Sequence, residues 1–174
     1  MRAATLLLSS LLCFFAADAK SEDSAANRDA TAVTKREGEP EVRDFRGDDR
    51  EMDEAMSKAR ASLSTFEQRL KQPPATQTYI GLKVRFEEDG HIEHMWIDEV
   101  EITPEGYRGR LGNHPVHIKA IDEGSAVQAT RAQVSDWMAV DAGKLVGGYT
   151  VRVQRARMSP GERTLFDESF GVEF

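Results

Sequence analysis

The stretch from Tyr79 to Ile102, YIGLKVRFEEDGHIEHMWIDEVEI, decides the fold of this chain. Apolar and polar residues alternate from Ile80 to Phe86, which predicts a β-strand with one buried face. The dipeptide Asp89-Gly90 is typical of a tight hairpin turn. A returning strand follows, and Asp98 interrupts its apolar phase, which predicts a β-bulge near Ile97. The residues that share this phase are Ile92, His94, Trp96, Val100 and Ile102.

An amphipathic helix is predicted before the hairpin. Asp48 or Asp49 caps its start, and the Pro73-Pro74 pair ends it. Apolar residues between these limits recur at spacings of three and four, which indicates one buried helix face. That face consists of Met52, Ala55, Met56, Ala59, Leu63, Phe66 and Leu70.

Shorter elements are predicted after the hairpin. We expect strands over 107–111, 114–120 and 126–130, a helical or 3₁₀ turn over 134–140, and a strand that contains Tyr149, Val151 and Val153. Alternation returns from Phe170 to Phe174, and this segment either forms an edge strand open to a partner or is tucked into the sheet. The pattern predicts an α+β fold, with an N-terminal amphipathic helix packed on a strongly bent antiparallel sheet or a small open β-barrel.

The first residues have the features of a secretory signal peptide. Arg2 supplies a short positive region, Ala3 to Ala17 carries no charge, and Ala17-Asp18-Ala19 is a small-x-small cleavage site. The apolar run is shorter than the roughly 20 residues of a membrane-spanning helix. We therefore predict that residues 1–19 are a signal peptide cleaved after Ala19, and that the mature protein is periplasmic or secreted without stable membrane insertion. An uncleaved anchor and lipoprotein processing at Cys13 are the alternatives.

Residues 20–47 are predicted to be a disordered polar linker. Between Lys20 and Phe45 the only larger aliphatic residues are Val33 and Val42, so the segment cannot bury enough apolar area to offset the entropy of ordering. Residues 48–174 then form a single α+β domain. Cys13 is the only cysteine, so the mature chain has no disulfide and depends on its apolar core.

The charge of the chain argues against two classes of protein. With 23 basic and 30 acidic residues, the net charge is −7. A nucleic-acid binder needs a basic face to displace counterions from phosphates, and a polybasic membrane-surface protein needs the same sign of charge. An acidic domain instead favours a protein partner with a basic surface through electrostatic steering.

Three stretches resemble the YegJ-like bacterial family, known as domain of unknown function 2314. They are MDEAMSKARASLSTF (Met52 to Phe66), EHMWIDEV (Glu93 to Val100) and VSDWMAVDAGKLVGGYT (Val134 to Thr150). The resemblance extends over about 48–152, and it implies a signal peptide, a spacer and one domain. Because the family has no established activity, no catalytic residues can be transferred from it to this chain.

Four residues in these stretches are candidate binding residues: His94, Trp96, Asp136 and Trp137. Both tryptophans are expected to be core residues, because a buried indole removes a large apolar area from water. Their indole N–H groups need acceptors when buried, and Asp136 and Asp98 are the candidates. The alternative is a groove lined by Trp96 and Trp137 that takes a peptide or a sugar.

The four histidines raise the question of a zinc site. They are His91, His94, His114 and His117. Residues three apart on a strand point to opposite faces, so His94 and His114 are expected to point inward and His91 and His117 outward. Neither pair alone supplies three ligands. We therefore predict no metal site and no cofactor, with His94 a hydrogen-bonded core histidine.

The favoured functional hypothesis is a non-enzymatic binding module that acts on another envelope or secreted protein, because no complete catalytic constellation is found in the sequence. Two alternatives stay open. One is a hydrolase of cell-envelope material that uses His94, Asp98 and Asp136, and the other is a purely structural envelope protein. The sequence does not define the oligomeric state.

Overall fold

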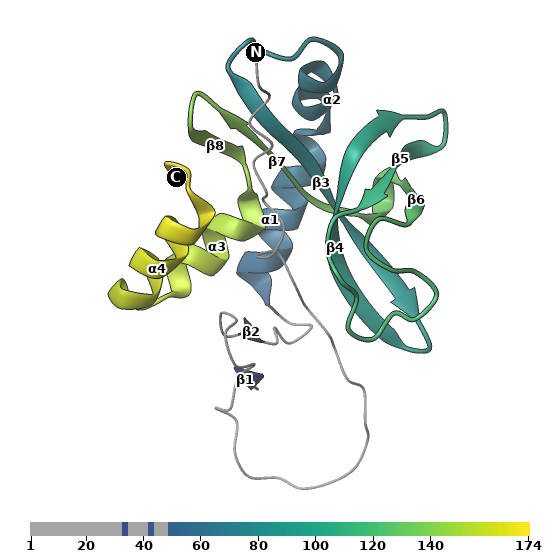
Figure 1. Cartoon of the computed structure of the whole chain (residues 1–174). Coiled ribbons are helices and arrows are strands. Elements are labelled where there is room, and N and C mark those ends of the chain that lie inside the picture. Colours follow the sequence, from purple (N-terminus) through teal and green to yellow (C-terminus); the bar gives the residue numbers. More distant parts are fainter. Residues whose placement is uncertain (1–32, 35–41, 44–48) are drawn as a thin grey trace, which may run out of the picture.

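The computed structural model describes residues 33–34, 42–43 and 49–174 (Figure 1). The predicted signal peptide and its cleavage site lie outside the described residues. Inside the predicted linker, strands β1 (Val33–Thr34) and β2 (Val42–Arg43) pair antiparallel, which the composition of that segment did not predict. Among the described residues, none of the helices combines the length and the apolar character needed to span a membrane.

Six strands form one antiparallel sheet in the order β6-β5-β4-β3-β7-β8. The predicted hairpin is confirmed as β3 (Gln77–Glu88) and β4 (His91–Ile102). The remaining strands are β5 (Gly106–Leu111), β6 (Ala126–Thr130), β7 (Val134–Asp141) and β8 (Lys144–Gly147). The α+β class is thereby confirmed, with a sheet that is open and not closed into a barrel.

The predicted bulge in β4 lies just beyond Ile97. The pairing of β4 with β5 shifts register between Asp98 and Glu101, and Glu99 between them has a φ of 51°. A bulge of this kind bends its strand and strengthens the local twist. In Figure 1 the β5–β6 end of the sheet accordingly turns away from β3 and β7.

The predicted N-terminal helix is confirmed as two helices, α1 (Arg50–Ala61) and α2 (Leu63–Lys71). Asp49 caps α1 by accepting a hydrogen bond from the Met52 backbone N–H at 3.2 Å. The break falls at Ser62, whose hydroxyl donates to the Lys58 carbonyl at 3.0 Å. Such back-bonding competes with the helical hydrogen bonds and bends helices, which accounts for the break. The apolar stripe continues beyond it with Leu63 and Phe66.

The prediction of a helical or 3₁₀ turn over 134–140 is wrong, because this segment is strand β7. All seven of its residues from Val134 to Val140 are buried, since β7 lies between β3 and β8 and is covered on both faces. A strand buried on both faces has no alternation to indicate it. A 3₁₀ turn does occur, but just before the strand, at η1 (Arg131–Gln133).

Two predicted strands are not strands. Tyr149, Val151 and Val153 lie in helix α3 (Tyr149–Arg157). Residues 114–120 form a loop whose backbone N–H groups bond to a carboxylate and not to a neighbouring strand. Both structures depend on acidic side chains far away in the sequence, which a local pattern cannot show.

The C-terminal alternation is also interrupted by a helix. Phe170 is the last residue of α4 (Pro160–Phe170), and only Glu173 then bridges to Lys144 at the edge of β8. The Leu145 N–H donates to the Glu173 carbonyl, and the Glu173 N–H donates to the Gly143 carbonyl, each at 2.8 Å. Of the two alternatives for this segment, the structure shows the one in which it is tucked against the sheet.

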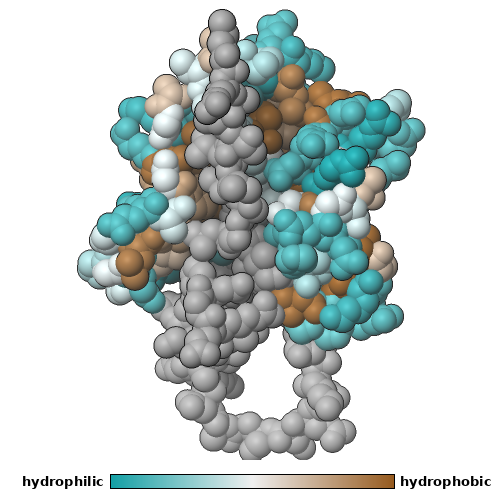
Figure 2. Space-filling model, viewed as in Figure 1, coloured by the Kyte–Doolittle hydropathy of each residue, from teal (hydrophilic) through white to brown (hydrophobic). Residues whose placement is uncertain are grey.

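The sheet buries apolar side chains on both faces. α1 and α2 contribute Ala59, Leu63 and Phe66 to the larger cluster, and α3 and α4 contribute Val151 and Phe170 to a second one. In Figure 1, α3 and α4 lie at one side of the molecule, and β5 and β6 lie at the other. Figure 2 shows hydrophilic and hydrophobic residues interspersed on the face it draws.

The loop 114–120 is held to β4 by Glu93, whose side chain is fully buried. Its carboxylate accepts hydrogen bonds from the backbone N–H groups of Val116, His117 and Ile118. This carboxylate supplies the partners that a strand would otherwise give these groups.

We predict that Glu93→Ala lowers the free energy of unfolding by about 3 kcal/mol, because three backbone N–H groups lose their buried acceptor. Urea denaturation measures this change. Glu87→Ala is the matched control, since Glu87 is an exposed acid of the same hairpin, and it should change stability by less than about 0.5 kcal/mol. Equal effects of the two substitutions would contradict the role of Glu93.

Candidate functional site

The four candidate residues lie on β4 and β7, the two strands that flank β3. Lys83 of β3 is opposite Trp96 on one side and Asp136 on the other. Leu82 is likewise opposite Trp137. Successive strand residues point to opposite faces, so Trp96 and Asp136 share the face of Lys83, while Trp137 lies on the other face.

Lys83 is the residue that sequence reasoning missed. It is only 4% exposed, and its Nζ lies 5.6 Å from the centre of the Trp96 ring. The alternation in β3 placed it on a solvent face, but α3 and α4 cover that face. Asp136 is the residue that could have indicated a buried lysine, because a buried carboxylate needs a neighbouring cation to compensate its charge.

Asp136 is fully buried and connects the sheet to α3. Its carboxylate accepts hydrogen bonds from the backbone N–H groups of Trp137 (2.8 Å), Tyr149 (3.1 Å) and Thr150 (2.7 Å), and from the Thr150 hydroxyl (2.6 Å). Burial raises the pKa of Asp136, and the Thr150 hydrogen bonds and the charge of Lys83 oppose that rise. Because Gly148 has no side chain to cap α3, Asp136 caps the helix from a neighbouring strand.

His94 is half-buried on the same face, opposite Arg85. Burial, together with the charges of Lys83, Arg85 and Arg60, lowers the pKa of His94 to about 3. The imidazole is therefore neutral at ordinary pH. A neutral ring can donate and accept hydrogen bonds, but it is a weak base for taking a proton from a substrate.

Tyr79 and Asp98 form a second polar pair near the bulge. The Tyr79 hydroxyl donates to Asp98 Oδ1 at 2.7 Å, and burial raises the pKa of both groups. Two glycines make room for this pair. A Cβ at Gly81 would lie 2.2 Å from the Tyr79 hydroxyl, and one at Gly112 would lie 2.5 Å from Asp98 Oδ2.

The residues of the hydrolase alternative thus lie on one face but are engaged in different structural contacts. The donors around Asp136 belong to β7 and α3, and Asp98 accepts from Tyr79. The arrangement can neutralise buried charge and anchor a helix.

Both tryptophans are buried, at 2% exposure for Trp96 and 1% for Trp137, in different apolar clusters. The structure therefore does not line one groove with them. The expectation that an aspartate accepts the Trp137 indole N–H is wrong, because that group donates to the Ser62 hydroxyl at 2.9 Å. For the Trp96 indole N–H, the described residues provide no acceptor.

The four histidines do not form one cluster of rings, and strand parity predicted the position of only some of them. His91 and His117 do face one another, with ring centres 4.8 Å apart and nearly parallel planes. His114 was expected to point inward, yet its side chain is 77% exposed and contacts Glu123 at 2.9 Å, because its segment is a loop. Within 49–174 and the two short strands before it, no three or more histidines, cysteines or acids cluster as metal ligands.

We predict that Asp136→Ala lowers the free energy of unfolding by about 3 kcal/mol, because the start of α3 loses its cap and Lys83 its nearby charge. Thermal and urea unfolding measure the loss. Asp122→Ala, in an exposed loop, is the matched control and should be nearly neutral. If both substitutions were neutral, Asp136 would not anchor the second helical layer.

His94→Gln tests the neutral imidazole. The pKa of histidine is 6.5 when unperturbed and about 3 here, so the unfolded chain binds more protons between these values and wild-type stability falls as pH decreases. Between pH 7.5 and pH 5, the wild type should lose up to about 2 kcal/mol more than the variant. Urea titrations at both pH values measure this difference. The same pH dependence in both proteins would mean that His94 is protonated in the folded state.

Comparison with known proteins gives three findings. The family model described as "Uncharacterized protein conserved in bacteria (DUF2314)" matches residues 49–174. A protein of Neisseria meningitidis serogroup B that is named for ankyrin repeats is 38% identical over 88 residues, which are 50% of this chain and 35% of that protein. The uncharacterized protein YegJ of Escherichia coli K12 is 25% identical over 104 residues, 60% of this chain and 67% of YegJ. The chain thus matches about a third of the first relative's length, and no solved structure matches it.

Proposed function

This chain belongs to the DUF2314 family, as its sequence motifs predicted, and from that premise we propose that it is an exported, non-enzymatic binding module. Its partner is another envelope or secreted protein, which adds an extended segment to the free edge of β6. The features of residues 1–19 support export. The match to about a third of a longer protein supports the description as a module.

The observation that carries the proposal is the difference between the two edges of the sheet. At β8 the C-terminal segment bonds to the edge through Glu173, Leu145 and Gly143. At the other edge, β6 pairs with β5 alone among the described strands. An open edge offers a row of backbone donors and acceptors that a partner strand can bind.

The register identifies which groups face outward. Leu111 N–H donates to the Ser125 carbonyl at 2.9 Å, which sets the hydrogen-bonding phase of β5 and β6 and makes Gly109–Val127 and Tyr107–Ala129 the hydrogen-bonded pairs. Val127 and Ala129 consequently bond inward. The N–H and C=O groups of Ala126 and Gln128 point away from β5.

The sequence of β6 does nothing to block such pairing. Edge strands in natural proteins commonly carry Lys, Pro or another charge that prevents strand addition. The sequence from Ala126 to Thr130 is AVQAT, with no charge and no proline. Ala126, Gln128 and Thr130 are exposed, while Val127 and Ala129 belong to the larger apolar cluster.

These features define the partner segment. Its apolar residues would extend the core beside Val127 and Ala129, and its alternate residues would be polar beside Gln128. From Asp48 onward the chain has 16 basic and 22 acidic residues, so long-range attraction favours a basic partner. Backbone hydrogen bonds supply affinity, and the alternating side chains supply specificity.

Gln128→Pro tests the proposal, because it removes an outward N–H and leaves the hydrogen bonds between β5 and β6 intact. Immobilised wild type should retain at least one protein from a native envelope extract, and Gln128→Pro should retain at least tenfold less of it. In the complex, the backbone amides of Ala126 and Gln128 should exchange their hydrogens more slowly than in the free protein.

Gln128→Thr is the matched control, since it keeps the backbone N–H and should bind like wild type. Circular dichroism verifies that both variants are folded. Equal retention by all three proteins, or retention by none of them, would overturn strand addition at β6.

A further inference from the structure

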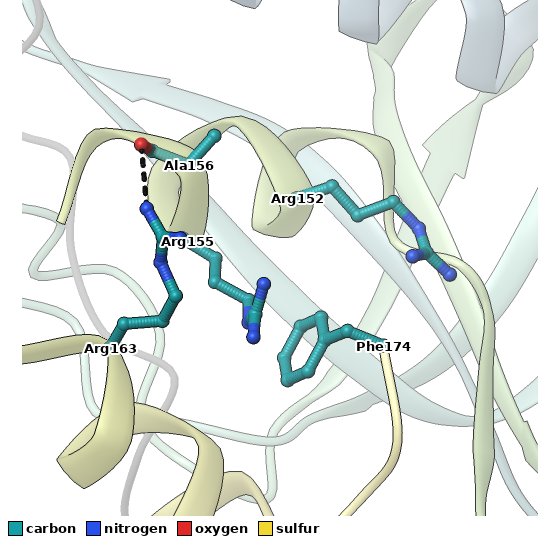
Figure 3. A pocket seen from close by; sticks show the side chains of 5 residues that line it. All are labelled: Arg152, Arg155, Ala156, Arg163 and Phe174. Carbon is teal, nitrogen blue, oxygen red and sulfur yellow. Dashed lines mark hydrogen bonds between the residues drawn. The ribbon is translucent and has the colours of Figure 1, made fainter. Parts of the chain in front are cut away.

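The two C-terminal helices and Phe174 line an open, basic pocket of about 270 Å³ (Figure 3). Arg152 and Arg155 come from α3 and Arg163 from α4, and Phe174 forms a further wall. Figure 1 places this region at the side of the molecule opposite β6. An inference about the pocket is therefore independent of the function proposed for that edge.

Arg163 provides the observation that points to a ligand. Its Nη2 donates to the carbonyls of Ala156 and Met158, each at 3.2 Å, which fixes the guanidinium in place. Its Nε is buried and has no hydrogen-bond partner among the described residues. A buried donor without an acceptor costs free energy, and an acceptor oxygen brought within hydrogen-bond distance of this Nε would remove that cost.

The other two guanidinium groups are also held in position. Arg155 donates to both carboxylate oxygens of Asp167 at 2.6 Å and lies 4.7 Å from the centre of the Phe174 ring. Arg152 donates to the carbonyls of Gly147 at 3.0 Å and Leu145 at 2.7 Å. Each guanidinium has five N–H donors, so donors remain on both after these bonds.

The charge in the pocket is opposite to that of the chain. Three arginines line it, and Asp167 is the carboxylate that bonds to one of them, Arg155. The chain as a whole has a net charge of −7. The positive charge of the pocket therefore comes from the arginines that line it, and it favours the binding of an anion.

We infer that this pocket binds an oxyanion, either a carboxylate or a phosphate group. Anion oxygens accept hydrogen bonds from Arg163 Nε and from the remaining donors of Arg152 and Arg155. The Phe174 ring contacts the apolar group that carries the anion. The arginines are already positioned, so binding orders few side chains.

Titration with sodium phosphate and, separately, with sodium acetate at constant ionic strength tests the inference. The Nε–Hε resonance of Arg163 reports anion binding by NMR. We expect it to shift saturably with one anion or both, and the dissociation constant to rise at least tenfold in Arg152→Gln. Arg163→Lys keeps the charge and removes the Nε–H, so it should weaken binding to a similar extent, measured by calorimetry.

Arg110→Gln is the matched control, because Arg110 is an exposed arginine of β5 that also pairs with an acid, Glu99. It should bind the anion like wild type. If Arg163→Lys does not fold, Arg152→Gln still decides the question. Tighter binding of phosphate identifies a phosphoryl ligand, and binding of acetate that is as tight or tighter identifies a carboxylate. No saturable shift with either anion, or equal affinity in Arg152→Gln and wild type, would overturn the inference.

Discussion

The second helical layer of this domain depends on one buried carboxylate. Asp136 stands on β7 and accepts hydrogen bonds from the first residues of α3, a helix whose own cap position is Gly148. A charge in such a place is tolerated only with compensation, which the bonded N–H groups and Lys83 provide. The sheet and α3 are thus connected through a polar contact, around which Trp96, Met138 and Val151 form an apolar cluster.

The other end of α3 is held by a second ionic contact. Arg157, in its last turn, pairs with Asp49 and with Glu51 at the start of α1. Asp49 also caps α1, and the Arg157 hydrogen bond holds the pKa of Asp49 below its usual value. One carboxylate therefore joins the first helix of the domain to the C-terminal helices, and the two layers are fixed to one another through α3.

Much of the fold could be predicted from local pattern. The β3–β4 hairpin, the helical stripe and the displaced phase beyond Ile97 all appear in the sequence as periodicity and turn residues. The errors share a physical cause. β7 is buried on both faces, and α3 and the loop 114–120 depend on Asp136 and Glu93, which lie far from them in the sequence. Lys83 was predicted to face solvent, because the sequence pattern did not reveal that α3 covers this face of the sheet.

The contact between the C-terminal segment and β8 also has a consequence for stoichiometry. A sheet with two open edges can add copies at both ends and grow into a fibre without limit. Here Glu173 bridges to Lys144 at one edge of the six-stranded sheet, and β6 at its other edge pairs with β5 alone among the described strands. If two copies of the domain paired through β6, each would use its open edge, and the assembly would end as a discrete pair.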